Sequence, residues 1–288
     1  MNVRDCTPNN IVLPESNYYT LKPFGLALGA LGPRLQRFLT ACLERGQFPL
    51  RWKTGKLVLI AKYGRPADSP SAYRPIVLLD EVGKLFERVI ADRLVGHLTR
   101  VGPNLADSQF GFRRGRSTVD AIMRVGSLAT GDAVSRGVVV LAVSLDIANT
   151  FNTLPWSCIR EALRYHRVPT YLHRVVGAYL RDRAVIYPGN QGEWIRREMS
   201  CGVPQGSVLG PLLWNIGYDW VLRTDHPSGV SVVCSPTTWG SSSPETPQRP
   251  VCTARSVPRA PRRAVLVSLT GPFGAGACLG FNAIGSWT

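Results

Sequence analysis

The stretch GVVVLAVSLDIANTF, from Gly137 to Phe151, decides how this chain folds. An unbroken apolar run that ends in a carboxylate is typical of a buried strand, here with Asp146 at its carboxyl end. A carboxylate in that position can hold Mg²⁺ if a second carboxylate lies nearby. An aspartate that caps a helix or closes a turn would show the same pattern. Both interpretations stay open at this point.

A glycine-rich stretch, GVPQGSVLGPLL over residues 202–213, follows further along the chain. Gly202, Gly206 and Gly210 indicate a loop whose backbone comes close to another group, and Gln205 offers an amide at its tip. The apolar residues at the end of this stretch predict a helix. An ordinary turn between a strand and a helix is the alternative.

Two basic stretches precede the apolar strand. In IAKYGRP, residues 60–66, and SAYRP, residues 71–75, Lys62 follows a predicted strand and Arg74 stands before a rigid proline. Lysine binds phosphate as a point charge and arginine as a two-pronged donor, so both residues could grip phosphate groups. A solvated basic surface is the alternative.

The second basic stretch is SQFGFRRGRSTVDAI, residues 108–122. Ser117 and Asp120 have the spacing of a capping box, which predicts a helix start. Glycines and a helix N-terminus favour anion binding, and aromatic rings can stack on bases. The residues that could make such contacts are Arg113, Arg114, Arg116, Phe110 and Phe112. A basic loop with two buried aromatic side chains is the alternative.

Periodicity outlines the remaining elements. Helices are expected from Pro33 to Gly46, from Val82 to about Thr99, and in two segments that open with Pro155 and Pro169. Strands are expected over residues 56–61, 185–187, 193–195 and 229–234, and the middle two of these form a hairpin.

The composition limits the class of protein. The chain has 288 residues, of which 44% are hydrophobic, and a formal net charge of +15. This charge makes nucleic acid the first partner to consider and an anionic membrane surface the second. No apolar run reaches the length of a transmembrane helix. The seven cysteines are scattered without zinc spacing, and the N-terminus has no apolar signal core. A reduced, intracellular protein without structural zinc is expected.

The composition changes abruptly at Ser235. Ser, Thr, Pro and Gly dominate from there to the end, Glu245 is the one acidic residue, and neither helical nor alternating periodicity continues. Such a segment buries too little apolar surface to offset the entropy of ordering it. We therefore expect this tail to lack stable structure.

In this order and spacing, the four motifs resemble those of reverse transcriptases. More narrowly, the chain is similar to the polymerase domain of a non-LTR retrotransposon of the R1 type, from about Leu26 to Cys234. The resemblance implies an α+β fold, the fingers and palm of a right-hand polymerase, with an antiparallel palm sheet backed by helices and no thumb. The expected divisions are a weakly patterned segment (1–30), a partial fingers and palm domain (31–234) and a low-complexity, out-of-frame tail (235–288).

The resemblance also implies roles at a catalytic centre. Asp146 would be a catalytic, metal-binding aspartate, and the carbonyl of Ile147 would be a metal ligand beside it. Phe151 would be the aromatic gate that excludes a ribose 2′-OH. Mg²⁺ would be the cofactor, since two ions activate the primer 3′-OH and stabilise the leaving pyrophosphate.

Other roles concern the substrates. Lys62 and Arg74 would contact the triphosphate of the incoming nucleotide, and Gln205 and Gly206 would border the nucleotide and template pocket. The expected nucleic-acid contacts are Arg113, Arg114 and Arg116. The implied partners are an RNA template, a DNA primer and dNTPs, with no membrane and no zinc, and the implied location is the nucleus.

The chain departs from this family after Cys234. The family has Tyr-Ala-Asp-Asp on a hairpin there, whereas residues 235–239 read Ser-Pro-Thr-Thr-Trp. That pentapeptide can be encoded TCG-CCG-ACG-ACA-TGG. One A inserted after the first T gives TAC-GCC-GAC-GAC-ATG, which encodes Tyr-Ala-Asp-Asp-Met. We therefore hypothesise a frameshift, which also explains the change in composition, and expect a decayed or truncated copy.

Three functions are compatible with these observations. The first is an RNA-directed DNA polymerase by descent, which extends a primer 3′-OH by two-metal phosphoryl transfer. The second is a non-catalytic, basic nucleic-acid-binding remnant. The third is an RNA-dependent RNA polymerase, against which Phe151 at the gate position argues. Because the second acidic motif is missing, we expect this chain to be inactive as a polymerase.

Overall fold

The computed structural model describes residues 21–64, 69, 72–130, 140–145, 150–235 and 263–269. Its first element is helix α1, Leu21–Arg45, which runs through Pro33 instead of starting there. The predicted start was wrong because the leucines and alanines before Pro33 favour helix, and the helix continues through the proline despite the lost hydrogen bond and the crowding by its ring. The predicted end was right: Gly46 has φ +65°, and the N–H of Gln47 donates to the Cys42 carbonyl at 2.8 Å.

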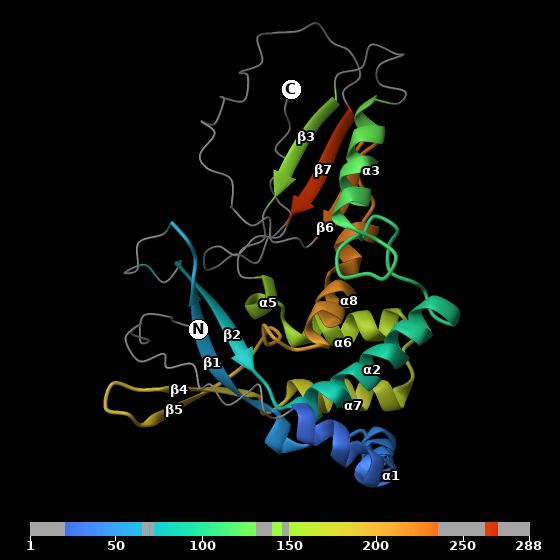
Figure 1. The fold of residues 1–288 in the computed structure, drawn as a ribbon. Coiled ribbons are helices and arrows are strands. Elements are labelled where there is room, and N and C mark those ends of the chain that lie inside the picture. The colour runs from blue at the N-terminus through green and yellow to red at the C-terminus, as the bar shows by residue number, and fades with distance from the viewer. Residues whose placement is uncertain are drawn as a thin grey trace, which may run out of the picture.

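Helices provide most of the larger of the two hydrophobic cores found among the described residues, and Figure 1 shows how these helices are arranged. They are α1, the 3-10 turn η4 (Leu50–Trp52), α2 (Glu81–Arg100), α5 (Thr150–Thr153), α6 (Trp156–Tyr165), α7 (Thr170–Leu180) and α8 (Gly210–Arg223). Asp80 caps α2 by accepting from the N–H of Val82 at 2.9 Å. Pro155 and Pro169 stand immediately before α6 and α7 as their N-caps. Proline suits helix starts because its missing N–H has no intrahelical partner there.

A four-stranded sheet carries the smaller core. Its order is β2 (Tyr73–Leu78), β1 (Thr54–Ala61), β4 (Ala184–Pro188) and β5 (Trp194–Glu198). The β1–β2 and β4–β5 pairs are antiparallel, and β1 and β4 run parallel. The hairpin predicted around residues 185–195 is thereby confirmed.

A second sheet joins β3 (Val140–Leu145), β7 (Arg263–Leu269) and β6 (Ser231–Ser235), with β7 in the middle. Helix α3, Thr118–Thr130, lies alongside it (Figure 1). Both ladders are parallel, so the expectation of an antiparallel sheet was wrong here. A parallel neighbour needs a long crossover connection, and the 27 residues from 236 to 262 are long enough to provide one.

Strand β7 also lies inside the tail for which no stable structure was expected. The rest of the tail lies outside the described residues, as do residues 1–20. The mixed α+β class is confirmed. In the described part of the chain, none of the helices combines the length and apolar character that a membrane crossing requires.

Candidate functional site

The glycine-rich loop, residues 202–209, is bonded at its start to the turn around α5. The N–H of Val203 donates to the Phe151 carbonyl at 2.6 Å, and the N–H of Gly202 donates to the Leu154 carbonyl at 2.8 Å. Gly202 has φ +73°, and a Cβ atom there would come closer than 3.0 Å to the Phe151 carbonyl oxygen. The close backbone approach predicted from the glycines is therefore present here.

The far side of the same loop lies against β2. The N–H of Val77 donates to the Gln205 carbonyl at 2.7 Å. Gly206 has φ +121°, and a Cβ atom there would also come closer than 3.0 Å to the Val77 carbonyl oxygen. Because β2 carries Arg74, the loop joins the Arg74 strand to the Phe151 turn.

Phe151 lies between the glycine-rich loop and an aromatic cluster. Its ring is 6.0 Å from that of Phe112 and 6.5 Å from that of Trp214, measured between centroids. Phe112 is 51% exposed and has a φ of +50°. The buried amide of Asn215 on α8 donates to the Gly111 carbonyl at 2.9 Å, which fixes this strained loop. Phe151 and Phe112 thus form a partly open aromatic wall.

Lys62 and Arg74 lie on one face of the four-stranded sheet. Arg74 pairs with Ile60 in the β1–β2 register, and the Lys62 N–H donates to the Ala72 carbonyl at 2.7 Å. Side chains alternate along a strand, so both cations lie opposite the face that packs Leu59 into the smaller core. The Nε of Arg74 is buried and has no hydrogen-bond partner within the described part of the chain.

The three arginines of the second basic stretch differ in their surroundings. Arg113 donates to the Ala106 carbonyl at 2.8 Å. Arg116 pairs with Asp107 at 2.8 Å and lies 5.2 Å from the centre of the Phe110 ring. Arg114 is exposed. Two of the three guanidinium groups therefore hold their own loop together, a role that the sequence did not indicate.

The predicted capping box follows directly after these arginines. The N–H of Ser117 donates to Asp120 at 2.7 Å, and the N–H of Asp120 donates to the Ser117 hydroxyl at 3.2 Å. The hydrogen bonds from Ser117 lower the pKa of the Asp120 carboxyl. The capping box is therefore confirmed, and the basic loop leads straight into the N-terminus of α3.

Sequence reasoning missed the buried carboxylate that anchors the end of the glycine-rich loop. Glu87 on α2 accepts hydrogen bonds from the Ser207 hydroxyl at 2.6 Å and from the N–H groups of Val208 and Leu209 at 2.8 and 3.1 Å. Glu87 is 1% exposed, and its charge is balanced by the equally buried Arg183 at 3.4 Å. One signal was readable: Glu87 lies three residues before Ile90, which is on the buried face of α2.

Tyr179 completes this anchor. Its hydroxyl lies 2.7 Å from that of Ser207, and its ring stacks beneath the guanidinium of Arg183 at 3.9 Å. Burial raises the pKa of Tyr179 well above its ordinary value, so the hydroxyl stays protonated. The end of the loop is thus held by a buried network of one anion, one cation and two hydroxyls.

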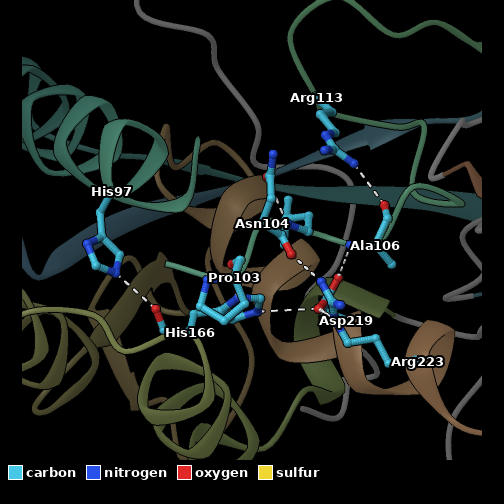
Figure 2. Close-up of polar contacts among 9 residues, drawn as sticks. His97, Pro103, Asn104, Ala106, Arg113, His166, Asp219 and Arg223 are labelled. Atoms are coloured by element: carbon cyan, nitrogen blue, oxygen red, sulfur yellow. Dashed lines mark hydrogen bonds and ion pairs between the residues drawn. The ribbon is translucent and has the colours of Figure 1, made fainter. Parts of the chain in front are cut away.

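A second buried carboxylate, Asp219 on α8, has a structural role (Figure 2). It accepts from the Ala106 N–H at 2.7 Å and from Arg223, and His166 Nε2 lies 3.4 Å away, at ion-pair distance but outside hydrogen-bond geometry. Burial raises the pKa of Asp219, but the contacts with His166, Ala106 and Arg223 outweigh it and hold this pKa below its ordinary value. The carboxylate therefore joins α8 to the loop after α2.

The family of the chain follows from comparison with known proteins. Residues 60–234 match the family described as reverse transcriptase (RNA-dependent DNA polymerase). The chain belongs to the reverse transcriptase family. The match begins in β1 and ends in β6, so it includes every residue of the site described above.

Similar proteins place the chain among reverse transcriptases of non-LTR retrotransposons. It is 39% identical over 173 residues to the probable RNA-directed DNA polymerase from transposon BS of Drosophila melanogaster, covering 59% of this chain and 18% of that protein. It is 32% identical to the Pol polyprotein of the R1 element of Bradysia coprophila, covering 67% and 18%. A telomerase structure from Candida tropicalis is 12% identical with a TM-score of 0.44, covering 60% and 39%. The chain spans about a fifth of the length of these curated relatives.

The predicted catalytic residues, Asp146 and Ile147, lie outside the described residues. Within the described ranges, no group of three or more His, Cys, Asp or Glu side chains is placed to hold a metal ion. The magnesium site expected from the family therefore stays a prediction.

Proposed function

We propose that this chain is the fingers and palm part of a reverse transcriptase from a non-LTR retrotransposon, with a nucleotide pocket around the glycine-rich loop. One observation carries the proposal: the loop joins β2, which bears Arg74, to the turn that bears Phe151. Residues from three distant stretches of the sequence are thus brought to one place, in the family whose substrates are nucleotides.

The chemistry of these residues suits a nucleoside triphosphate. Lys62 and Arg74 share a face of the sheet, so their charges can act on one polyphosphate. Among the described residues the buried Nε of Arg74 meets no hydrogen-bond acceptor, and a phosphate oxygen would supply one. Phe151 would lie against the sugar, where a ring excludes a 2′-hydroxyl by its bulk, and Gln205 and Gly206 would border the base.

The chain would also bind an RNA template and a DNA primer. Its charge of +15 favours phosphate backbones of any sequence. Arg114 is the exposed arginine of the second basic stretch, while Arg113 and Arg116 would contribute charge from positions fixed by their own loop. The location that agrees with this function is the nucleus.

Catalysis is a separate question from binding. After Cys234 the sequence lacks the acidic pair that would face Asp146, and a lone aspartate is a poor site for Mg²⁺. We therefore propose that this chain binds nucleotide and nucleic acid without extending a primer. The missing acidic pair after Cys234 therefore favours the second candidate function, a non-catalytic nucleic-acid-binding remnant.

The test is binding of a labelled RNA–DNA hybrid by fluorescence anisotropy, with photocrosslinking of labelled dTTP as a second readout. Affinity for the hybrid should fall by several decades between about 50 and 200 mM salt. Arg74→Ala should reduce crosslinking of dTTP about tenfold or more, because it removes a charge-assisted contact. Arg88→Ala, at an exposed position on α2, is the matched control. Salt-independent binding, or equal crosslinking by both variants, would refute the proposed site.

A further inference from the structure

Strand β7 occupies the space between two strands that do not pair with each other. On one side Arg263 to Ser268 pair with Val140 to Leu145, and on the other side Val265 to Leu269 pair with Ser231 to Ser235. β7 is therefore hydrogen-bonded along both edges, and β3 and β6 face it as the two walls of a slot one strand wide (Figure 1).

The walls and the filling strand come from different parts of the chain. β3 and all but the last residue of β6 lie within the region that matches the reverse transcriptase family, which ends at residue 234. β7 lies beyond it, in the tail that follows the change in composition. The matched region thus leaves a gap in its own sheet, and a segment outside the match fills it.

An empty slot would be costly because β6 is deeply buried. Val233 and Cys234 are 1% and 4% exposed, and Cys234 belongs to the larger core. The outer edge of β6 is already paired, since the Cys234 N–H donates to the Ser108 carbonyl and the Phe110 N–H donates to the Cys234 carbonyl. The backbone groups of its inner edge pair with β7, and leaving buried backbone groups unpaired is unfavourable.

We propose that β3 and β6 form a binding slot for an extended apolar peptide, and that residues 263–269 of this same chain are its occupant. The sequence RAVLVSL suits the slot because its β-branched and apolar residues favour a strand. Addition of a strand to free sheet edges is a general mode of peptide binding, in which main-chain hydrogen bonds give the affinity. The tail would then be a built-in ligand of the palm.

A single cysteine substitution in β7 tests the register of the β6–β7 ladder, because β6 already contains the second cysteine of the cross-link. Cys234 stands opposite Ser268 in the β6–β7 ladder and is not part of a disulfide within the described residues. Neighbouring strands bring Cα atoms within the range that a disulfide requires. Under mild oxidation, Ser268→Cys in the full chain should give a Cys234 cross-link detectable by peptide mass mapping. Val267→Cys, one residue out of register, is the control. Equal yields from both variants, or no cross-link, would overturn the assignment.

A proline substitution in β7 tests whether an occupied slot protects the amides of β3 and β6 from hydrogen exchange. Val265→Pro removes a ladder donor in the middle of β7, so hydrogen exchange of amides in β3 and β6 should accelerate at least about tenfold, as several hydrogen bonds are lost together. Ala283→Pro, in the tail but outside β7, should leave exchange unchanged. A synthetic peptide of residues 261–271 should restore protection to the Val265→Pro chain.

If the Val265→Pro variant loses protection against hydrogen exchange throughout the chain, addition of the peptide still decides the result. Recovery of protection in both α2 and the slot strands on addition of the peptide would support the proposal. Unchanged exchange in β3 and β6 of the variant, or failure of the peptide to restore protection, would overturn it.

Discussion

Replacing Glu87 by alanine should destabilise the protein more than any exposed charge change. The variant leaves Arg183 buried without its counter-charge, and it leaves the Ser207 hydroxyl and the N–H groups of Val208 and Leu209 without their acceptor. Removal of one partner from a buried ion pair typically costs about 3–5 kcal/mol. We expect a loss in this range in the free energy of unfolding, measured by urea denaturation followed by circular dichroism.

Two controls separate the buried pair from a general effect of charge. Glu161→Ala, at an exposed position on α6, should change the free energy of unfolding by less than about 0.5 kcal/mol. The double variant Glu87→Leu with Arg183→Met removes both charges, so it should recover a large part of the loss. A cost for Glu87→Ala below about 1 kcal/mol, the range of a solvent-exposed pair, would show that the buried network does not hold the loop.

Three further predictions follow from the described contacts and from the sequence. Gly206→Ala should lower the free energy of unfolding by about 1 kcal/mol or more beyond the loss caused by Gly192→Ala. Both glycines have positive φ, but only at Gly206 would the new Cβ meet the Val77 carbonyl. Equal losses for the two variants in denaturation experiments would contradict this. The folded-state pKa of Asp219 is depressed, so its contribution to stability is present above the ordinary carboxyl pKa and is lost as the pH falls through the folded value. Asp219→Asn should therefore flatten the loss of thermal stability at acid pH. An unchanged dependence of the melting temperature on pH would argue against this role of Asp219. No primer extension is expected on poly(rA)/oligo(dT) with Mg²⁺, and robust synthesis that Asp146→Ala abolishes would mean that another acid completes the site.

Features that depend on neighbouring residues could be predicted from the sequence. The capping box of Ser117 and Asp120 involves a single turn of helix, and the β4–β5 hairpin is a local pairing. Gly202 and Gly206 could be recognised because close backbone contact excludes larger residues. Their partners could not be read in the same way, since the approach of Val77 to Gly206 depends on the packing of distant elements.

Long-range pairings were missed for the same reason. The Glu87–Arg183 pair joins residues 96 positions apart, and no local pattern in α7 or β4 marks Arg183 as its partner. Strand β7 was missed because its seven residues lie within a stretch dominated by Ser, Pro and Gly, and its stability comes from two neighbours that precede it in the chain. The start of α1 was missed because a proline was given more weight than the helix formers before it.

The two attachments of the glycine-rich loop have a mechanical consequence. The loop is bonded to the Phe151 turn at one end and to Val77 of β2 at the other, and its two glycines fit against carbonyl groups that leave no space for a side chain. Because these contacts are close on both sides, we expect a displacement of β2 at Arg74 to be passed through the loop to the Phe151 turn and its aromatic wall.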